Sequence, residues 1–157
     1  MPSTVPAVKD GLADYLAATT GLREVDGVQV YSATPDAANV AKEHVILGNV
    51  VAPQSWRGLG AQRRAETPSM SCFVTIVRPG AEEPAIRAAR ARAYALLALV
   101  ETALKGDPSA AGAVPLPRQT TVTESALEEE PVTLADGGGG RSARLRFTVE
   151  WLAHLNS

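Results

Sequence analysis

The segment from Glu66 to Pro108 constrains the fold of this chain most, because it encodes a strand, a turn and a long helix without interruption. From Met70 to Val77 apolar side chains recur at every second position, which is the period of a β-strand. Arg78-Pro79-Gly80 then supplies turn chemistry. From Pro84 to Leu104 apolar residues recur every three or four positions, as on one face of an amphipathic helix. This segment therefore predicts a helix that packs on a β-sheet.

The rest of the chain repeats these two periods. Helical spacing from Val5 to Thr19 predicts a first helix. Short runs rich in β-branched residues predict further strands at Val28–Ser32, His44–Ala52, Arg118–Leu127 and Ser142–Trp151. The order helix, strand, strand, strand, helix, strand, strand predicts an α+β fold. We expect an antiparallel or mixed sheet of about five strands with two main helices packed on one face.

A single domain over residues 1–157 is the prediction from chain length. Two segments are predicted to be long interaction loops within it. Residues 53–68 hold two glycines, two prolines and three arginines, with at most weak strand character. Residues 128–141 combine an acidic triplet, a proline and four consecutive glycines, a composition that does not bury itself.

No catalytic, cofactor-binding or metal-binding constellation is recognisable in the sequence. Cys72 is the single cysteine and lies in mid-strand, so a buried structural thiol is expected rather than a nucleophile. His44 and His154 are far apart and have no partners at metal-ligand spacing. The four glycines open a strand, whereas a phosphate-binding loop opens a helix. We therefore expect no enzyme, no cofactor and no metal.

A signal peptide and a membrane span are also not recognisable, so a reducing, cytoplasm-like compartment is expected.

Charge is unevenly distributed, although the formal net charge is only -2. Residues 57–105 carry eight Lys/Arg against four Asp/Glu, whereas residues 106–140 carry one against six. Alternating signs suit self-association through complementary surfaces, and ordinary solvated surface is the alternative.

Trp56 and the arginines near it have the composition of an interface anchor, and equally of a contact to single-stranded nucleic acid. A third possibility is that Trp56 folds back on the core. On the long helix, two arginines and a tyrosine lie opposite the apolar face. The candidate interface residues are Trp56, Arg57, Arg63, Arg64, Arg87, Arg90, Tyr94 and Arg141.

Several segments occur together in an order that is found in one known family. They are the N-terminal helix, Val28–Tyr31, His44–Gly48, Trp56-Arg57-Gly58-Leu59-Gly60, Arg64-Ala65-Glu66-Thr67, the strand 70–78, Pro79-Gly80, the helix ending Val100–Leu104, Asp107-Pro108, the Gly-rich loop and Ala143–Val149. In the order of these segments and in their general sequence character, the chain resembles the tail terminator (tail completion) proteins of long-tailed bacteriophages.

The resemblance implies a small subunit that assembles as a homo-oligomeric ring, a hexamer, in the virion at the head-tail junction, after assembly in the host cytoplasm. Such a ring caps the tail tube, stops its polymerisation and offers a joining surface to the head connector. The implied partners are further copies of the chain, the tail tube protein and a head-completion or connector protein. DNA would pass through the lumen without specific binding. Glu128, Glu129 and Glu130 are then candidates to face that lumen, since like charges repel phosphates.

Other functions stay open at this point. The chain also suits another neck or tail component, such as a head-completion or tail tube protein. A small soluble binding domain, an enzyme with an unfamiliar pocket and a nucleic-acid-binding module are the remaining alternatives.

Overall fold

The computed structural model describes residues 3–36, 40–56, 63–114 and 121–156. In chain order its elements are α1 (Val5–Ala18), a 3-10 turn (Glu24–Asp26), β1 (Gln29–Tyr31), β2 (Glu43–Val51), β3 (Gln54–Trp56), β4 (Arg63–Glu66), β5 (Ser69–Pro79), α2 (Glu83–Gly106), β6 (Thr121–Thr133), β7 (Gly139–Glu150) and β8 (Ala153–Asn156). The predicted α+β class is confirmed.

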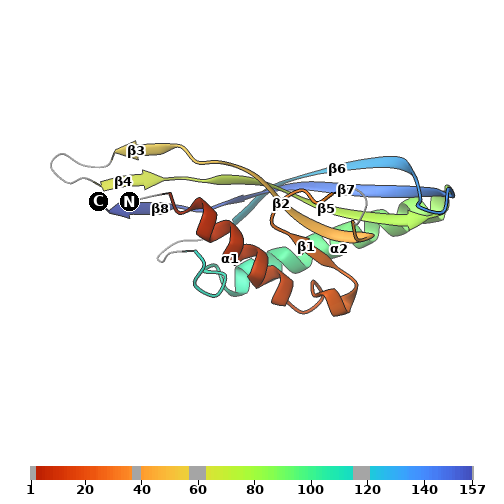
Figure 1. Cartoon of the computed structure of the whole chain (residues 1–157), viewed down its shortest axis with the longest axis horizontal. Coiled ribbons are helices and arrows are strands. Elements are labelled where there is room, and N and C mark those ends of the chain that lie inside the picture. The colour runs from red at the N-terminus through yellow and green to blue at the C-terminus, as the bar shows by residue number, and fades with distance from the viewer. Residues whose placement is uncertain (1–2, 37–39, 57–62, 115–120, 157) are drawn as a thin grey trace.

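The main sheet contains five strands in the order β1-β2-β5-β7-β6. Its first pair is parallel and its other pairs are antiparallel, so the sheet is mixed. Both helices lie on the same side of this sheet (Figure 1). Within the described residues the opposite side carries no helix, and we refer to it as the helix-free face.

The core forms where the apolar faces of the strands pack against the apolar face of α2. Alternate side chains of β5, from Met70 to Ile76, are buried, as are those of β7 from Ala143 to Val149. They pack against the apolar stripe of α2, which includes Leu96 and Val100. Cys72 belongs to this core, and burial raises the pKa of its thiol to about 12. The predicted structural thiol is therefore confirmed.

Three strands of the main sheet continue into a second sheet, which we call the ribbon: β3, β4 and β8, in that order. It prolongs β2, β5 and β7 past a break at residues 52–53, 67–68 and 151–152. Two backbone hydrogen bonds cross the break, from Thr67 N to Pro53 O (3.1 Å) and from Trp151 N to Pro68 O (3.2 Å). Because proline has no N–H to donate, Pro53 and Pro68 interrupt the ladder there.

The predicted long loop at residues 128–141 is mostly strand, so that prediction was wrong, and the described part of the loop predicted at residues 53–68 also contains strands, β3 and β4. In the first segment β3 pairs with β4, and residues 57–62 lie outside the described part of the chain. In the second, residues 128–133 continue β6 and residues 139–141 begin β7. Only a short turn remains, closed by a hydrogen bond from Leu134 N to Gly138 O (2.8 Å). Pairing with β7 satisfies the backbone of β6, and an edge strand tolerates glutamate and proline.

The first turn of α1 is capped by a residue from a distant strand. Glu66 of β4 is fully buried, and its carboxylate accepts hydrogen bonds from Ser3 Oγ (2.6 Å), Thr4 Oγ1 (2.8 Å) and Thr4 N (3.1 Å). Burial by itself raises the pKa of Glu66, but these hydrogen bonds outweigh it and leave the pKa below its usual value. The carboxylate also lies at the positive end of the helix dipole. This contact joins α1 to the ribbon.

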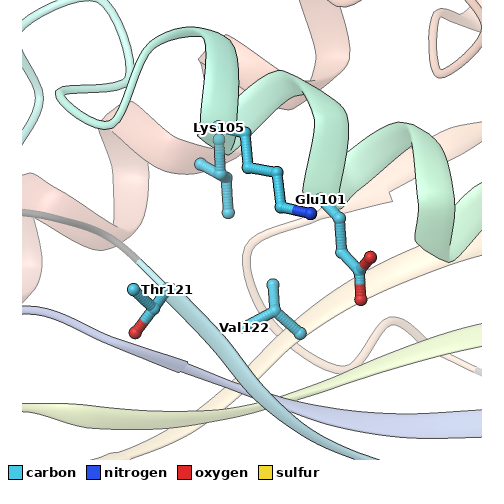
Figure 2. Close-up of a pocket in the computed structure, with 5 residues that line it drawn as sticks. Glu101, Lys105, Thr121 and Val122 are labelled. Atoms are coloured by element: carbon cyan, nitrogen blue, oxygen red, sulfur yellow. The ribbon is translucent and has the colours of Figure 1, made fainter.

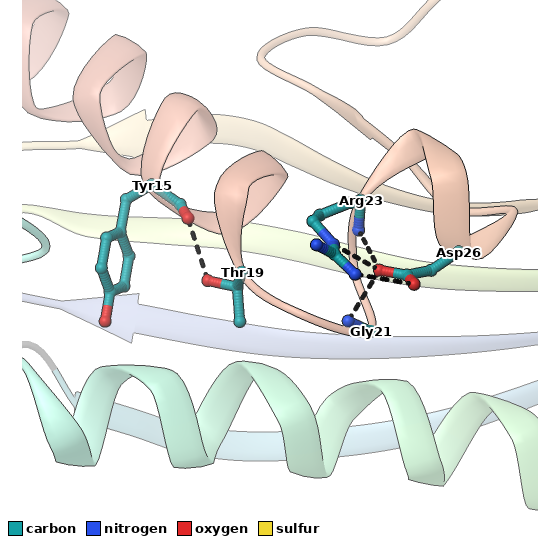
Figure 3. Close-up of polar contacts among 5 residues, drawn as sticks. All are labelled: Tyr15, Thr19, Gly21, Arg23 and Asp26. Atoms are coloured by element: carbon teal, nitrogen blue, oxygen red, sulfur yellow. Dashed lines mark hydrogen bonds and ion pairs between the residues drawn. The ribbon is translucent and has the colours of Figure 1, made fainter.

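Asp26 fixes the connection between α1 and β1 (Figure 3). Its Oδ2 accepts hydrogen bonds from Gly21 N (2.8 Å), Arg23 N (3.2 Å) and Arg23 Nε (2.9 Å). The Arg23 side chain contributes most to lowering the pKa of Asp26, which is about 2. The resulting turn presents Val25 to solvent at 83% exposure.

Candidate interaction surface

The antiparallel pair β3 and β4, which we call the Trp56 hairpin, carries an ordered aromatic and basic patch. Trp56 is 71% exposed, and Val51 at the end of β2 is exposed to the same degree. The Arg64 guanidinium carbon lies 5.3 Å from the centre of the Trp56 ring, within cation–π range. Arg64 Nη1 also donates to Gln54 Oε1 at 3.3 Å. Trp56 thus points into solvent, which excludes the alternative that it folds back on the core.

Two predicted members of this patch are not placed. Arg57 and the side chain of Arg63 lie outside the described residues.

The helix-free face carries a polar hollow, which we call the sheet-face hollow. A row of directly paired residues runs across it: His44 of β2, Thr75 of β5, Arg144 of β7 and Glu128 of β6. The hollow is lined by Thr34, His44, Ile46, Thr75, Glu128, Glu130, Ser142 and Arg144. It therefore gathers charged and polar groups from four strands.

Arg144 is held flat inside this hollow. Its guanidinium carbon lies 3.8 Å from the centre of the Phe73 ring. Its Nε is buried and has no hydrogen-bond partner among the described residues. The arginine is thus positioned mainly by stacking.

His44 is 5% exposed, and its Nδ1 lies 2.7 Å from the carbonyl oxygen of Ala41. Burial lowers the pKa of His44, so the neutral ring is favoured. In the neutral form Nδ1 carries the proton, and Nε2 is then an acceptor.

The acidic triplet is divided between the two faces of the sheet. Glu128 and Glu130 line the sheet-face hollow, whereas Glu129 alternates to the helix side. Arg90 of α2 holds Glu129 with two parallel hydrogen bonds, Nε to Oε1 at 2.5 Å and Nη2 to Oε2 at 3.0 Å. Arg90 also lowers the pKa of the Glu129 carboxyl. Glu129 therefore points to the other side of the sheet from Glu128 and Glu130, and the prediction that all three face a lumen stays a prediction.

The arginines and tyrosine of α2 do not share one outer surface either. Arg90 reaches the edge of the sheet, so its predicted position away from the sheet was wrong. The reason is its length, since a guanidinium at the border of a helix face reaches a strand beside it. Arg87 is exposed and pairs with Glu83 one turn earlier (3.1 Å), and Tyr94 is 45% exposed. Arg87 and Tyr94 are therefore the predicted residues of α2 that make no hydrogen bond or ion pair with the sheet in the described part of the chain.

Arg141 lies at the start of β7 and donates to the carbonyl oxygen of Ala81 at 3.1 Å and 3.3 Å. It supports the turn before α2, because that carbonyl lies between β5 and the helix. A structural contact within the chain thus accounts for this candidate interface residue.

One ionic contact was missed by sequence reasoning. Glu43 of β2 accepts from Arg78 of β5 (2.5 Å) and from Arg92 of α2 (2.9 Å). Burial raises the pKa of Glu43, but the two arginines outweigh it and lower the pKa overall. Three elements that are distant in sequence meet here, so no local spacing signals the contact.

A smaller pocket lies between the end of α2 and the start of β6 (Figure 2). Lys105 and Glu101 extend from α2 toward Thr121 and Val122 of β6, and Leu104 completes the lining. One lysine, one carboxylate and one hydroxyl here form no nucleophile and base pair of the kind that covalent catalysis uses.

Metal and membrane sites are not found within the described part of the chain. No three His, Cys, Asp or Glu side chains there are placed to hold a metal ion. None of the helices there is both long enough and apolar enough to cross a membrane.

Comparison of the chain with protein-family models and with curated proteins gives no match.

Proposed function

We propose that this chain is a structural subunit of the tail terminator type. Copies of it form a ring on the end of a bacteriophage tail tube, stop tube polymerisation and provide the joining surface for the head connector. The ring, a hexamer, belongs to the head-tail junction of the virion. DNA passes through its lumen without specific binding.

The observation that carries this proposal is the Trp56 hairpin. It extends beyond the first turn of α1 at one end of the molecule (Figure 1) and presents an exposed tryptophan ordered by an arginine. Tryptophan and arginine are the residues most enriched among binding hot spots. A monomer gains nothing from exposing this patch, whereas a subunit that contacts a neighbour does.

The helix-free face gives further support. One side of the main sheet is covered by α1 and α2, while the other presents charged groups in a hollow. A subunit with two unlike surfaces contacts its neighbours head to tail, and such contacts close into a ring when the rotation closes.

Native mass spectrometry and negative-stain imaging of the purified chain test the proposal, with and without tail tube protein. We expect discrete rings that bind the end of a tube and stop its growth. A chain that stays monomeric under both conditions would contradict it. Long tubes of the chain alone would identify a tube protein instead.

Trp56→Ala is the sharpest variant for this test. Because the Trp56 side chain is exposed, we expect the subunit to stay folded and the oligomeric ring to dissociate. The expected loss of association free energy is about 2 kcal/mol or more per contact between subunits. Val25→Ala is the matched control, since Val25 is an exposed apolar residue of the 3-10 turn that follows α1. Equal assembly of both variants would remove the tryptophan from the interface.

A further inference from the structure

The Trp56 hairpin belongs to the ribbon, whereas the sheet-face hollow lies on the main sheet. Arg64 in the hairpin and Thr75 in the hollow belong to β4 and β5, which follow each other in one extended run. Arg64 and Thr75 are eleven residues apart, and at about 3.3 Å per residue this extended run places them roughly 35 Å apart. The hairpin of one chain therefore does not reach the hollow of that same chain.

The Trp56 hairpin is positively charged and offers hydrogen-bond donors. Residues 54–66 contain three arginines and one carboxylate, Glu66, which is fully buried against the first turn of α1. In the described part, the Arg64 guanidinium is stacked on Trp56, so little side-chain freedom is lost when it binds. Guanidinium groups donate up to five hydrogen bonds and prefer carboxylates.

The sheet-face hollow presents negative charge and hydrogen-bond acceptors. Glu128 and Glu130 stand two residues apart on the edge strand and point to the same face. Neither takes part in an ion pair among the described residues. The buried His44 adds an acceptor at Nε2, and Thr75 and Ser142 add hydroxyls. With Arg144 included, the hollow carries one net negative charge.

We propose that the Trp56 hairpin of one copy docks on the helix-free face of a second copy, with Arg64 over Glu128 and Glu130. This inference rests on the proposed ring and names the two surfaces that build it. The occupant is a second copy because the chain itself supplies both complementary charges, at positions that one copy does not bring together. The two surfaces differ, so each copy uses its hairpin toward one neighbour and its hollow toward the other.

Charge reversal tests the pairing. We expect Arg64→Glu alone, and Glu128→Lys with Glu130→Lys alone, each to raise the concentration for half-assembly at least about tenfold, measured by sedimentation. Mixing the two variants in equal amounts should restore rings, because each hairpin then finds a hollow of opposite sign. Circular dichroism checks that both variants are folded.

Cross-linking gives a second measurement that needs no charge change. A chain with Gln54→Cys, on the same face as Arg64 and Trp56, is mixed with a chain carrying Ala126→Cys, on the same face as Glu128, and treated with a short bismaleimide. Cys72 is buried and stays unreactive. We expect dimers in the mixture and few in either variant alone. Thr102→Cys on α2 replaces Ala126→Cys as the control and should give no dimers.

The outcomes separate this inference from the proposed function. Wild-type rings together with unaffected reversal variants and no cross-link would overturn the docking and leave the ring in place. A wild-type chain that never assembles would overturn both.

Discussion

At the scale of single residues, Glu66 shows how a polar side chain in the interior is retained. It is fully buried, yet its carboxylate accepts bonds from Ser3 and Thr4 at the start of α1. Thr4, the N-cap of α1, makes no side-chain capping bond of its own. A carboxylate from β4 therefore does the work that a local cap does in most helices.

We expect Glu66→Gln to destabilise the fold by about 1–3 kcal/mol at pH 7, because buried donors lose a charged acceptor. The pKa of Glu66 is lowered in the folded state from its ordinary value of 4.5. Its contribution is therefore full above that ordinary pKa and is lost as the pH falls through the folded pKa. Urea unfolding at several pH values measures this.

The matched control is Glu150→Gln, at an exposed position of β7. It should leave the free energy of unfolding nearly unchanged. A difference between wild type and Glu66→Gln that stays constant from pH 7 down to acid would contradict the role of the ionised carboxylate.

At the scale of elements, β2 owes its shape to one glycine. Glycine inside a strand often marks a bulge, and the register of β2 against β5 shifts between Leu47 and Val50, on either side of Gly48. A Cβ at residue 48 would collide with the carbonyl oxygen of Ser71. The bulge also leaves the Gly48 carbonyl free to accept from Lys9 Nζ of α1 at 2.8 Å.

Gly48→Ala is expected to cost about 1–3 kcal/mol, because the backbone of β2 must move away from β5. Gly106→Ala is the comparison, since a Cβ there meets no atom within 4 Å and lies in a helix. That change should be neutral or stabilising by up to about 1 kcal/mol. Thermal unfolding of both variants checks the contrast, and equal melting temperatures would contradict it.

At the scale of the whole molecule, fewer of the predicted contact residues of α2 point away from the sheet than the sequence indicates. Helical spacing groups Arg87, Arg90 and Tyr94, but Arg90 is used inside the chain to hold Glu129 on the edge strand. Arg87 and Tyr94 remain at the surface. Of these three residues, Arg87 and Tyr94 are therefore the stronger candidates for a contact with another subunit.

Arg87→Glu and Arg90→Glu should consequently behave differently. Arg87→Glu is expected to change the free energy of unfolding by less than about 0.5 kcal/mol and to weaken ring assembly. Arg90→Glu places two carboxylates together and should lower the melting temperature of the isolated subunit. Calorimetry and sedimentation of both variants measure this. Equal thermal stability of the two would show that the Arg90 and Glu129 pair is unimportant.

The sequence by itself determined the parts whose signal is local. The strand from Met70, the Pro79-Gly80 turn and α2 follow from periods of two and 3.6 residues, which each segment carries alone. Buried Cys72 follows from the same alternation. The α+β class then follows from the order of these elements.

Tertiary structure alone decided which segments meet. Glu66 caps a helix 62 residues away, and Arg90 binds a glutamate 39 residues away. The ribbon exists because three distant strands continue past one break together. The hollow likewise needs four strands in register. Such contacts depend on pairing between remote segments, which leaves no period in either one. Composition alone therefore predicted loops for the second half of β6, residues 128–133, and for the Trp56 hairpin.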